Sequence, residues 1–254
     1  MSFFSDLGGG RFAATQHTAG PWDPAFMHAG PPAALLGRAL ARTAPRSGAF
    51  MARITFEILG PVPVGEVAVD ARVVRPGRSV ELLEGTLSAG GRAAMLARAW
   101  RVTAAPRSAG EAPPPPPLPD SPGAAPPALE GFGYGDAVEL RFAAGAWDEF
   151  GPATVWTRLR VPLLEGEEPS GMERVLAVAD SGNGVSAVLP LDRWLYINTE
   201  LTVHFRRAPR GEWICLDART AIDEGGAGLA TSVLSDADGP VASGAQSLLV
   251  APRA

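Results

Sequence analysis

A carboxylate at the end of a predicted helix is the first feature of this sequence that could carry chemistry. Asp180 closes an apolar helical pattern, and the loop-forming run 181–184 follows it directly. A strand-like run at 197–205 comes next. The two-residue period of a strand places four polar side chains on one face of that run: Asn198, Glu200, Thr202 and His204. An acid beside a polar strand face can orient a reactant and exchange a proton with it, so we expect the chemistry here.

The helix that ends at Asp180 is predicted to span residues 171–179. Ser170 and Glu173 have the spacing of a capping box, which marks its start. Four apolar residues fall on one face at helical spacing: Met172, Val175, Leu176 and Ala179. The helix should therefore be held against a core and present Asp180 at its carboxyl end.

Gln246 lies in a run of small residues, Ser243-Gly244-Ala245, near a predicted sheet centre. An amide in such a place has to be hydrogen-bonded. Structural roles compete with chemical ones at all three polar positions. Asp180 can cap its own loop, Asn198 can be a turn residue at a strand start, and Gln246 can be a structural amide.

Composition restricts the class of protein. The chain has 254 residues, is 46% hydrophobic, and carries a net charge of −5 without a single Lys. These values are typical of a globular protein and argue against nucleic acid as a partner. Cys215 is the only cysteine, and the three His residues lack ligand-like spacing, so we expect no disulfide, metal or cofactor. With neither a signal peptide nor an apolar run of about 20 residues, a cytoplasmic protein without membrane contact is expected.

The elements follow the same order twice, on either side of a proline-rich stretch. We divide the chain into a first unit at 1–103, a stiff and poorly ordered linker at 104–131, and a second unit at 132–254. Each unit has one helix, at 33–42 and 171–179, followed by a run of strands. The predicted strands are 12–16, 51–59, 66–74, 79–88 and 92–102 in the first unit, and 137–143, 154–161, 197–205, 212–222, 228–235 and 241–250 in the second.

The two units also share sequence. Gly65-Glu66 matches Gly211-Glu212, and Leu87-Ser88 matches Leu234-Ser235, with an offset between 146 and 148 residues. Such an offset indicates a duplicated unit of roughly 100 residues. On this alignment Gln246 corresponds to Arg98, and the first helix ends without a carboxylate, so the first copy cannot build the same polar set. Two such sheets can pair edge to edge and so remove two exposed edges.

At this point the chain resembles the double hotdog acyl-CoA thioesterases, the type II acyl-CoA thioesterase-like group of the thioesterase superfamily. Three stretches carry the resemblance. The run 28–36, His-Ala-Gly-Pro-Pro-Ala-Ala-Leu-Leu, is similar to the start of the first hotdog helix, Asp180 follows the second helix, and the run 242–246 resembles the last strand with its glutamine. The implied fold is an α+β double hotdog: two repeats of a long helix packed on an antiparallel sheet, with the sheets joined edge to edge.

The resemblance implies a catalytic set of an Asp, a Thr or Ser, and a Gln that orient one water for attack on a thioester. Asp180 and Gln246 take the first and last places. The middle place falls on Asn198, or on Thr199 one residue away, and we favour Asn198 because it is predicted to share a face with Glu200, Thr202 and His204. Pro31 removes a backbone N–H close to the helix start, where a donor to the oxyanion could lie.

We therefore expect acyl-CoA hydrolysis to free acid and CoA, without a metal or an enzyme nucleophile. Gly30, His204 and Arg206 are the predicted substrate-binding residues. The rival interpretation is a non-catalytic acyl-CoA or acyl-lipid binding protein on the same fold. Double hotdogs resemble dimers of single ones and often assemble further, so a homodimer or higher homo-oligomer is expected.

Overall fold

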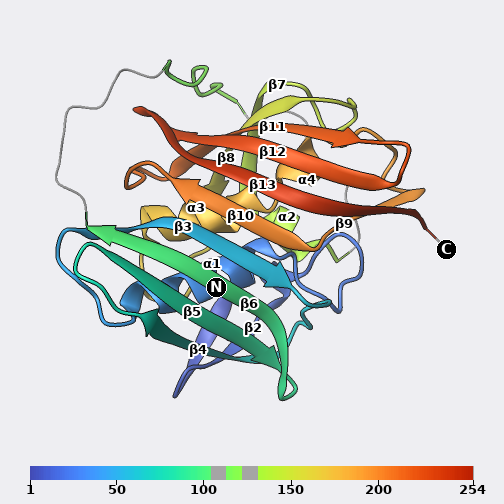
Figure 1. The fold of residues 1–254 in the computed structure, drawn as a ribbon. Helices are drawn as coiled ribbons and strands as arrows, with labels where there is room; N and C mark the ends of the chain where they lie inside the picture. The colour runs from blue at the N-terminus through green and yellow to red at the C-terminus, as the bar shows by residue number, and fades with distance from the viewer. Residues whose placement is uncertain (104–112, 122–130, 254) are drawn as a thin grey trace.

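In the computed structural model, residues 1–103, 113–121 and 131–253 are described, and they form one large antiparallel sheet with helices on one face (Figure 1). The elements of the first half are β1 (Phe4–Gly8), β2 (Arg11–Ala14), the 3-10 turn η1 (Gln16–Thr18), α1 (Gly30–Arg42), β3 (Ala49–Ile58), β4 (Glu66–Arg75), β5 (Val80–Ala89) and β6 (Arg92–Thr103). Those of the second half are α2 (Gly133–Ala137), β7 (Val138–Ala144), β8 (Ala153–Leu159), α3 (Gly171–Ala179), α4 (Gly182–Val185), β9 (Trp194–Asn198), β10 (Glu200–Phe205), β11 (Trp213–Ile222), β12 (Ala227–Asp236) and β13 (Gly239–Pro252).

The strand order shows the duplication directly. It runs β1-β2-β4-β5-β6-β3 and continues as β10-β13-β12-β11-β8-β7, with β9 paired to β13. The second half therefore repeats the first in reverse, and the two halves join where β3 pairs antiparallel with β10. This confirms the predicted double hotdog with edge-to-edge sheets.

A pseudo-two-fold axis passes through the β3–β10 junction. Thr55 lies opposite Thr202, 147 residues later, and their hydroxyl oxygens are 3.2 Å apart. The two residues hold the same place in their repeats, because Thr55 also pairs with Arg98 of β6 and Thr202 with Ala245 of β13. The ladders thus fix the offset at 147 and make Ala99 the counterpart of Gln246. The predicted match of Gln246 to Arg98 is wrong by one residue, which in a strand means the opposite face.

The helices α1 and α3 lie together behind β3 and β10 in Figure 1. Their apolar faces share one core that spans both repeats, with Leu36 and Leu40 of α1 and Leu176 of α3 fully buried. Burying a Leu side chain contributes about 1.5–3 kcal/mol, so this contact joins the repeats strongly. Glycine permits the close approach. A Cβ on Gly30 would lie 2.2 Å from the carbonyl oxygen of Ala177, and one on Gly37 would lie 2.3 Å from Cδ1 of Leu176.

The N-terminal residues bind the second repeat as well. The backbone N–H groups of Phe3 and Phe4 donate to the carbonyl oxygens of Pro162 and Leu163, each at 3.0 Å. The short strand β1, which the sequence analysis did not predict, follows this contact. The first repeat is therefore anchored to the second at both the sheet junction and the N-terminus.

Part of the predicted proline-rich linker lies against the second repeat. The indole N–H of Trp156 donates to the carbonyl oxygen of Pro116 at 3.1 Å, and Arg141 Nη1 donates to that of Pro119 at 2.9 Å. The segment 113–121 thus contacts β7 and β8, whereas 104–112 and 122–130 lie outside the described residues. Within the stiff, poorly ordered linker predicted for 104–131, the middle segment is thus ordered by hydrogen bonds to the second repeat.

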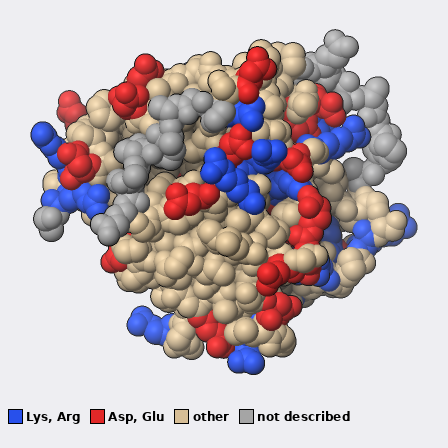
Figure 2. Space-filling view, turned by 180° about the vertical axis from the view of Figure 1, so that it is seen from behind, with Lys and Arg blue, Asp and Glu red and all other residues tan. Residues whose placement is uncertain are grey.

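The surface carries both signs of charge. On the face seen in Figure 2, arginine and acidic side chains are intermingled around a broad central area without charge. Among the helices of the described ranges, none is long and apolar enough to cross a bilayer.

Candidate active site

Asp180 lies at the carboxyl end of α3, and its side chain is almost completely buried. The helix begins as predicted. Ser170 Oγ accepts from the Glu173 N–H and the Glu173 carboxylate accepts from the Ser170 N–H, which completes a capping box. Asp180 is the C-cap, and α4 follows where the sequence predicted only a loop. The helix therefore delivers a carboxylate into the interior, where its oxygens require donors.

Two amide side chains supply donors to Asp180. The Nδ2 of Asn198 donates to Oδ1 of Asp180 at 2.7 Å. The Nε2 of Gln246, on the inner face of β13, donates to the same Oδ1 at 3.3 Å and to the Asp180 carbonyl oxygen at 3.2 Å. The three side chains that the sequence analysis grouped by resemblance are thus in direct contact, although they are separated by up to 66 residues.

A β-bulge turns Asn198 toward Asp180. Asn198 pairs with Leu248 of β13, whereas Thr202 pairs with Ala245. Residues 199–201 lie between Asn198 and Thr202, whereas only residues 246 and 247 lie between their partners on β13. The strand with the extra residue therefore bulges, at Thr199. The predicted strand 197–205 is consequently split into β9 and β10. The expected shared face is wrong, because Asn198 points inward with Leu248 while the polar face of β10 points outward.

Thr199 occupies the bulge itself and is exposed. Its backbone N–H donates to the carbonyl oxygen of Ser247 at 3.0 Å, and its Oγ1 lies 3.4 Å from the same oxygen. Thr199 still forms part of the cavity wall, but its hydroxyl is directed to the strand backbone rather than to Asp180. The geometry therefore favours Asn198 over Thr199 as the partner of the carboxylate.

A histidine completes the surroundings of Asp180. His28 Nδ1 lies 3.3 Å from Oδ2 of Asp180, and its ring stacks on Tyr134 with centroids 3.8 Å apart and planes 3° from parallel. Burial lowers the pKa of His28, and the Asp180 carboxylate opposes this shift. Burial also raises the pKa of Tyr134, whose hydroxyl donates to the Ala177 carbonyl oxygen at 2.9 Å.

His28 and Tyr134 had no assigned role in the sequence analysis. His28 opens the motif that carries the resemblance, so its place in 28–36 was the available signal. Tyr134 comes from the short helix α2, which no periodicity indicated. Both reach the site only through the packing of distant elements.

The polar groups border an apolar cavity of about 330 Å³. Asp180, His28, Asn198 and Tyr134 lie along its wall together with aromatic and aliphatic side chains. The apolar part includes Trp22, Phe26, Met27, Ile58, Val62, Phe132 and Trp147. Such a cavity suits a hydrocarbon chain whose reactive end meets the carboxylate.

Comparison with family models identifies the family of the chain. Residues 18–102 match the acyl-CoA thioesterase N-terminal domain, and residues 109–250 match the acyl-CoA thioesterase C-terminal domain. The chain belongs to the acyl-CoA thioesterase family. Its enzyme class, acyl-CoA thioesterase, is therefore the one that the sequence predicted.

Solved structures share the fold of this thioesterase. A putative thioesterase II from Thermobifida fusca is 19% identical with a TM-score of 0.71, and 97% of this chain and 96% of that chain are covered. A conserved hot dog protein of unknown function from Alicyclobacillus acidocaldarius is 18% identical, with a TM-score of 0.70 and coverage of 98% and 95%. The acyl-CoA thioesterase II TesB2 of Mycobacterium marinum is 16% identical, with a TM-score of 0.67 and coverage of 99% and 95%. Among curated proteins, none matches the chain significantly.

The predicted substrate-binding residues of this thioesterase are placed very differently. Gly30 begins α1, and its N–H donates to His28 Nδ1 at 3.2 Å, next to Asp180. His204 is exposed on the outer face of β10, opposite Arg53 and Ser243. Arg206 is exposed beyond the end of β10. Neither His204 nor Arg206 lines the cavity, because the bulge at Thr199 separates their face from that of Asn198.

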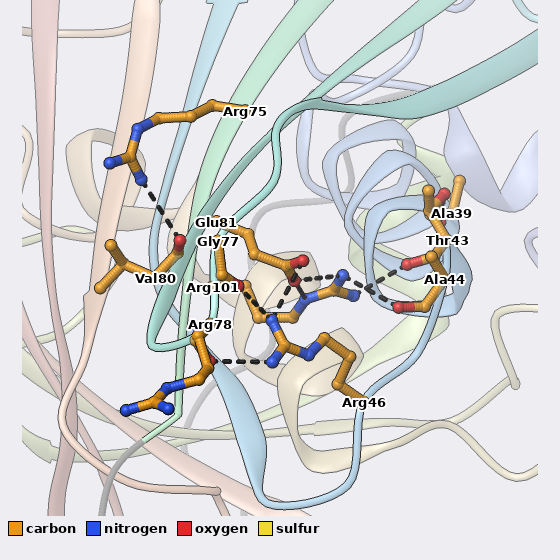
Figure 3. A network of polar contacts seen from close by, with 10 residues as sticks. All are labelled: Ala39, Thr43, Ala44, Arg46, Arg75, Gly77, Arg78, Val80, Glu81 and Arg101. Atoms are coloured by element: carbon orange, nitrogen blue, oxygen red, sulfur yellow. Dashed lines mark hydrogen bonds and ion pairs between the residues drawn. The ribbon is translucent and has the colours of Figure 1, made fainter.

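The pseudo-two-fold axis relates the site of this thioesterase to a second cavity of about 340 Å³. There Met51 takes the place of Asn198, and Arg101 that of Leu248, since Met51 pairs with Arg101 across an equivalent register shift. Arg101 is buried, donates twice to Glu81, and caps α1 by donating to the carbonyl oxygens of Thr43 and Ala44 at 2.8 and 2.9 Å (Figure 3).

The pseudo-two-fold axis relates two poles of the molecule: the cavity at Asp180, beyond the carboxyl end of α3, and the second cavity, at the carboxyl end of α1. The chemistry of the second pole differs from that of the first. The hydrogen bonds from Arg101 lower the pKa of Glu81, and Arg46 joins the same carboxylate at 3.1 Å. The carboxyl end of α1 therefore carries a cation, the charge that a helix C-terminus favours, where α3 carries an acid and two amides. The site built on Asp180 has no copy in the first repeat, as far as residues 1–103 are concerned.

Proposed function

We propose that this thioesterase hydrolyses acyl-CoA by a water molecule that Asp180 activates and that Asn198 and Gln246 help to orient. The observation that carries the proposal is the buried Asp180 carboxylate at the wall of an apolar cavity, held by two amide donors on Oδ1. These donors fix the direction of the carboxylate. General base catalysis by such a group contributes about 10²–10⁴ in rate.

The reaction requires one bond to form and one to break. The water oxygen attacks the thioester carbonyl carbon while Asp180 takes a proton from the water. The resulting oxyanion collapses, the C–S bond breaks, and the CoA thiolate leaves and takes up the proton from Asp180, which restores the carboxylate. Backbone N–H groups near Gly30 are the donors proposed for the oxyanion, and such donors contribute about 10²–10³ in rate. The Gly30 N–H itself donates to His28 Nδ1 in the free protein and would have to exchange this bond for one to the substrate.

The acyl chain is proposed to occupy the apolar cavity, with CoA outside it. The experiment that tests this function measures release of CoA thiol from acyl-CoA substrates of graded chain length. Hydrolysis with a preferred length supports the proposal. Binding of acyl-CoA without thiol release would instead support the non-catalytic binding protein, with Asn198 in the place of the family's Thr or Ser as its cause.

Asn198 and Thr199 can be separated by substitution. We expect Asn198→Ala to lower kcat by about 10², because loss of the 2.7 Å bond frees Asp180 to rotate. Thr199→Val should leave kcat within a few-fold of the wild type, since its hydroxyl faces Ser247. Steady-state kinetics of both variants is the measurement, and the reverse pattern would assign the role to Thr199.

Gln246→Ala should act on the same carboxylate as Asn198→Ala. Because both amides donate to Oδ1, the double variant is expected to lose less than the product of the single losses. Steady-state kinetics of the two single variants and the double variant is the measurement. Fully multiplicative losses would show that the two amides act on separate steps.

We also propose that the chain forms a homodimer or a higher homo-oligomer, as expected for double hotdogs. Multi-angle light scattering at micromolar concentration should give at least twice the chain mass of 26.3 kDa. A single species of the chain mass would reject this part of the proposal.

A further inference from the structure

Two tryptophans lie on the outer face of the second repeat, near the edge of the sheet. Val155 of β8 belongs to the main core, so its neighbour Trp156 points to the opposite face. On that face Trp156 pairs with Arg141 of β7, and Trp213 of β11 pairs with Arg158 of β8. A tryptophan on an outer face is solvent-exposed unless another segment covers it. Trp156 is only 3% exposed, so it is covered.

Charged side chains complete this surface. The guanidinium carbons of Arg141 and Arg158 lie 4.8 and 4.9 Å from the ring centroid of Trp213. Both guanidinium groups also donate to the Glu139 carboxylate, at 2.8 and 2.6 Å. We call Glu139, Arg141, Trp156, Arg158 and Trp213 the tryptophan platform. These contacts hold the arginine side chains in place, so the donors of the platform are preorganised for a ligand.

The segment 113–121, drawn between the two grey traces in Figure 1, lies on the tryptophan platform. The indole N–H of Trp156 and Nη1 of Arg141 donate to the carbonyl oxygens of Pro116 and Pro119. No backbone–backbone hydrogen bond joins this segment to another described residue. The segment therefore does not extend the sheet as an added strand. It is held through its carbonyl groups by side-chain donors, the mode in which aromatic grooves bind polyproline helices.

The residue types of the segment fit this mode of binding. Residues 113–117 are five consecutive prolines, which have no N–H and a φ fixed at about −65°, so they favour an extended polyproline helix. Their carbonyl oxygens can only accept, and the platform offers donors. A polyproline helix has about three residues per turn, which places Pro115 and Leu118 on one side. Both are half-buried, whereas residues 116 and 117 between them are exposed.

The corresponding face of the first repeat has no such platform within residues 1–103. Arg11 takes the place of Trp156, because their partners Ala68 and Cys215 differ by the repeat offset of 147 residues. Arg11 pairs with Glu66 there, and both side chains are 56% exposed. The aromatic surface is thus particular to the repeat on which the prolines lie.

We propose that the tryptophan platform is a polyproline-binding site, and that residues 113–120 of the same chain are its resident ligand. The class of ligand is an extended proline-rich segment that presents two carbonyl oxygens to Trp156 and Arg141. The site is separate from the proposed hydrolysis, since none of the platform residues lines the cavity at Asp180.

The experiment removes the resident ligand and supplies it again as a peptide. In a variant of the full chain, a Gly-Ser sequence of equal length replaces residues 113–120. The probe is the fluorescein-labelled peptide Pro-Pro-Pro-Pro-Pro-Leu-Pro-Asp, and binding is followed by fluorescence anisotropy. We expect saturable binding to the variant and much weaker binding to the wild type, whose tethered segment competes at an effective concentration of about millimolar. No saturable binding to the variant, or equally tight binding to both proteins, would overturn the proposal.

Trp156→Phe in the same variant tests the main donor. It keeps an aromatic ring but removes the indole N–H, so the peptide should bind about 2–10-fold more weakly, the effect of one hydrogen bond. Trp100→Phe on β6 of the first repeat is the matched control and should leave the affinity unchanged. Equal affinity in Trp156→Phe would contradict recognition by the platform.

Hydrogen exchange tests the same contact in the chain that keeps its own segment, should the Gly-Ser variant not fold. The chain has six tryptophans, and the indole N–H signal that Trp156→Phe removes is that of Trp156. Leu118→Asp places a charge at a half-buried position and should release the segment. Exchange of the Trp156 indole proton is then expected to rise about tenfold or more. An unchanged exchange rate would overturn the docking of the segment.

Discussion

Asp180→Asn is expected to lower kcat for acyl-CoA hydrolysis by about 10²–10⁴, the contribution of a general base. The substitution keeps the shape of the side chain and one acceptor oxygen for the amides of Asn198 and Gln246. It removes the group that takes the proton from water. The loss should therefore appear in kcat, with the fold retained.

Asp217→Asn is the matched control. Asp217 is an exposed carboxylate on β11, and its side chain accepts only a 3.3 Å bond from Thr154 Oγ1 in the described part of the chain. Thiol release should be unchanged in this variant. Thermal unfolding of both variants distinguishes lost chemistry from lost structure. Hydrolysis by Asp180→Asn at the wild-type rate would remove Asp180 from the mechanism.

Gly30→Ala is expected to damage both stability and activity. The new Cβ would lie 2.2 Å from the carbonyl oxygen of Ala177 and 3.1 Å from His28 Nδ1, so the ends of α1 and α3 must separate. Overpacking of this kind costs about 1–3 kcal/mol of the free energy of unfolding. The shift also disturbs the hydrogen bond from the Gly30 N–H to His28, the neighbour of Asp180, so kcat should fall as well.

Gly37→Ala tests the same helix contact with a movable neighbour. Its Cβ would meet Cδ1 of Leu176, the end of a flexible side chain, rather than a backbone atom. Denaturant unfolding should therefore show a smaller loss for Gly37→Ala than for Gly30→Ala, and kcat should change less. Equal losses in the two variants would mean that the carbonyl of Ala177 is not a rigid obstacle.

Local patterns in the sequence predicted most of the fold. The capping box at Ser170 and the apolar face of α3 fixed that helix at residues 171–179, as observed. The alternation in the strands and the repeated pairs predicted both halves of the sheet and their edge-to-edge pairing, but not which strands form the junction. These signals are local or repeated, so they do not depend on knowing which strands pair.

The predictions from sequence were wrong or incomplete where pairing between distant strands determines the geometry. Nothing around Thr199 resembles a bulge in sequence, because the bulge arises from how one strand pairs with β13. The one-residue error that matched Gln246 to Arg98 has the same origin. His28 and Tyr134 were missed because they meet Asp180 through the packing of α2 and of the start of α1 against the end of α3.

The axis through Thr55 and Thr202 has an evolutionary meaning. In a dimer of identical single hotdogs, every substitution occurs at both poles, so a change that strengthens one pole also alters the other. Fusion of the two copies into one chain removes this constraint. Arg101 caps α1 at one pole, while Leu248 occupies the corresponding place at the other. The covalent link between the repeats thus permits one pole to hold the fold together while the other keeps the residues of the proposed active site.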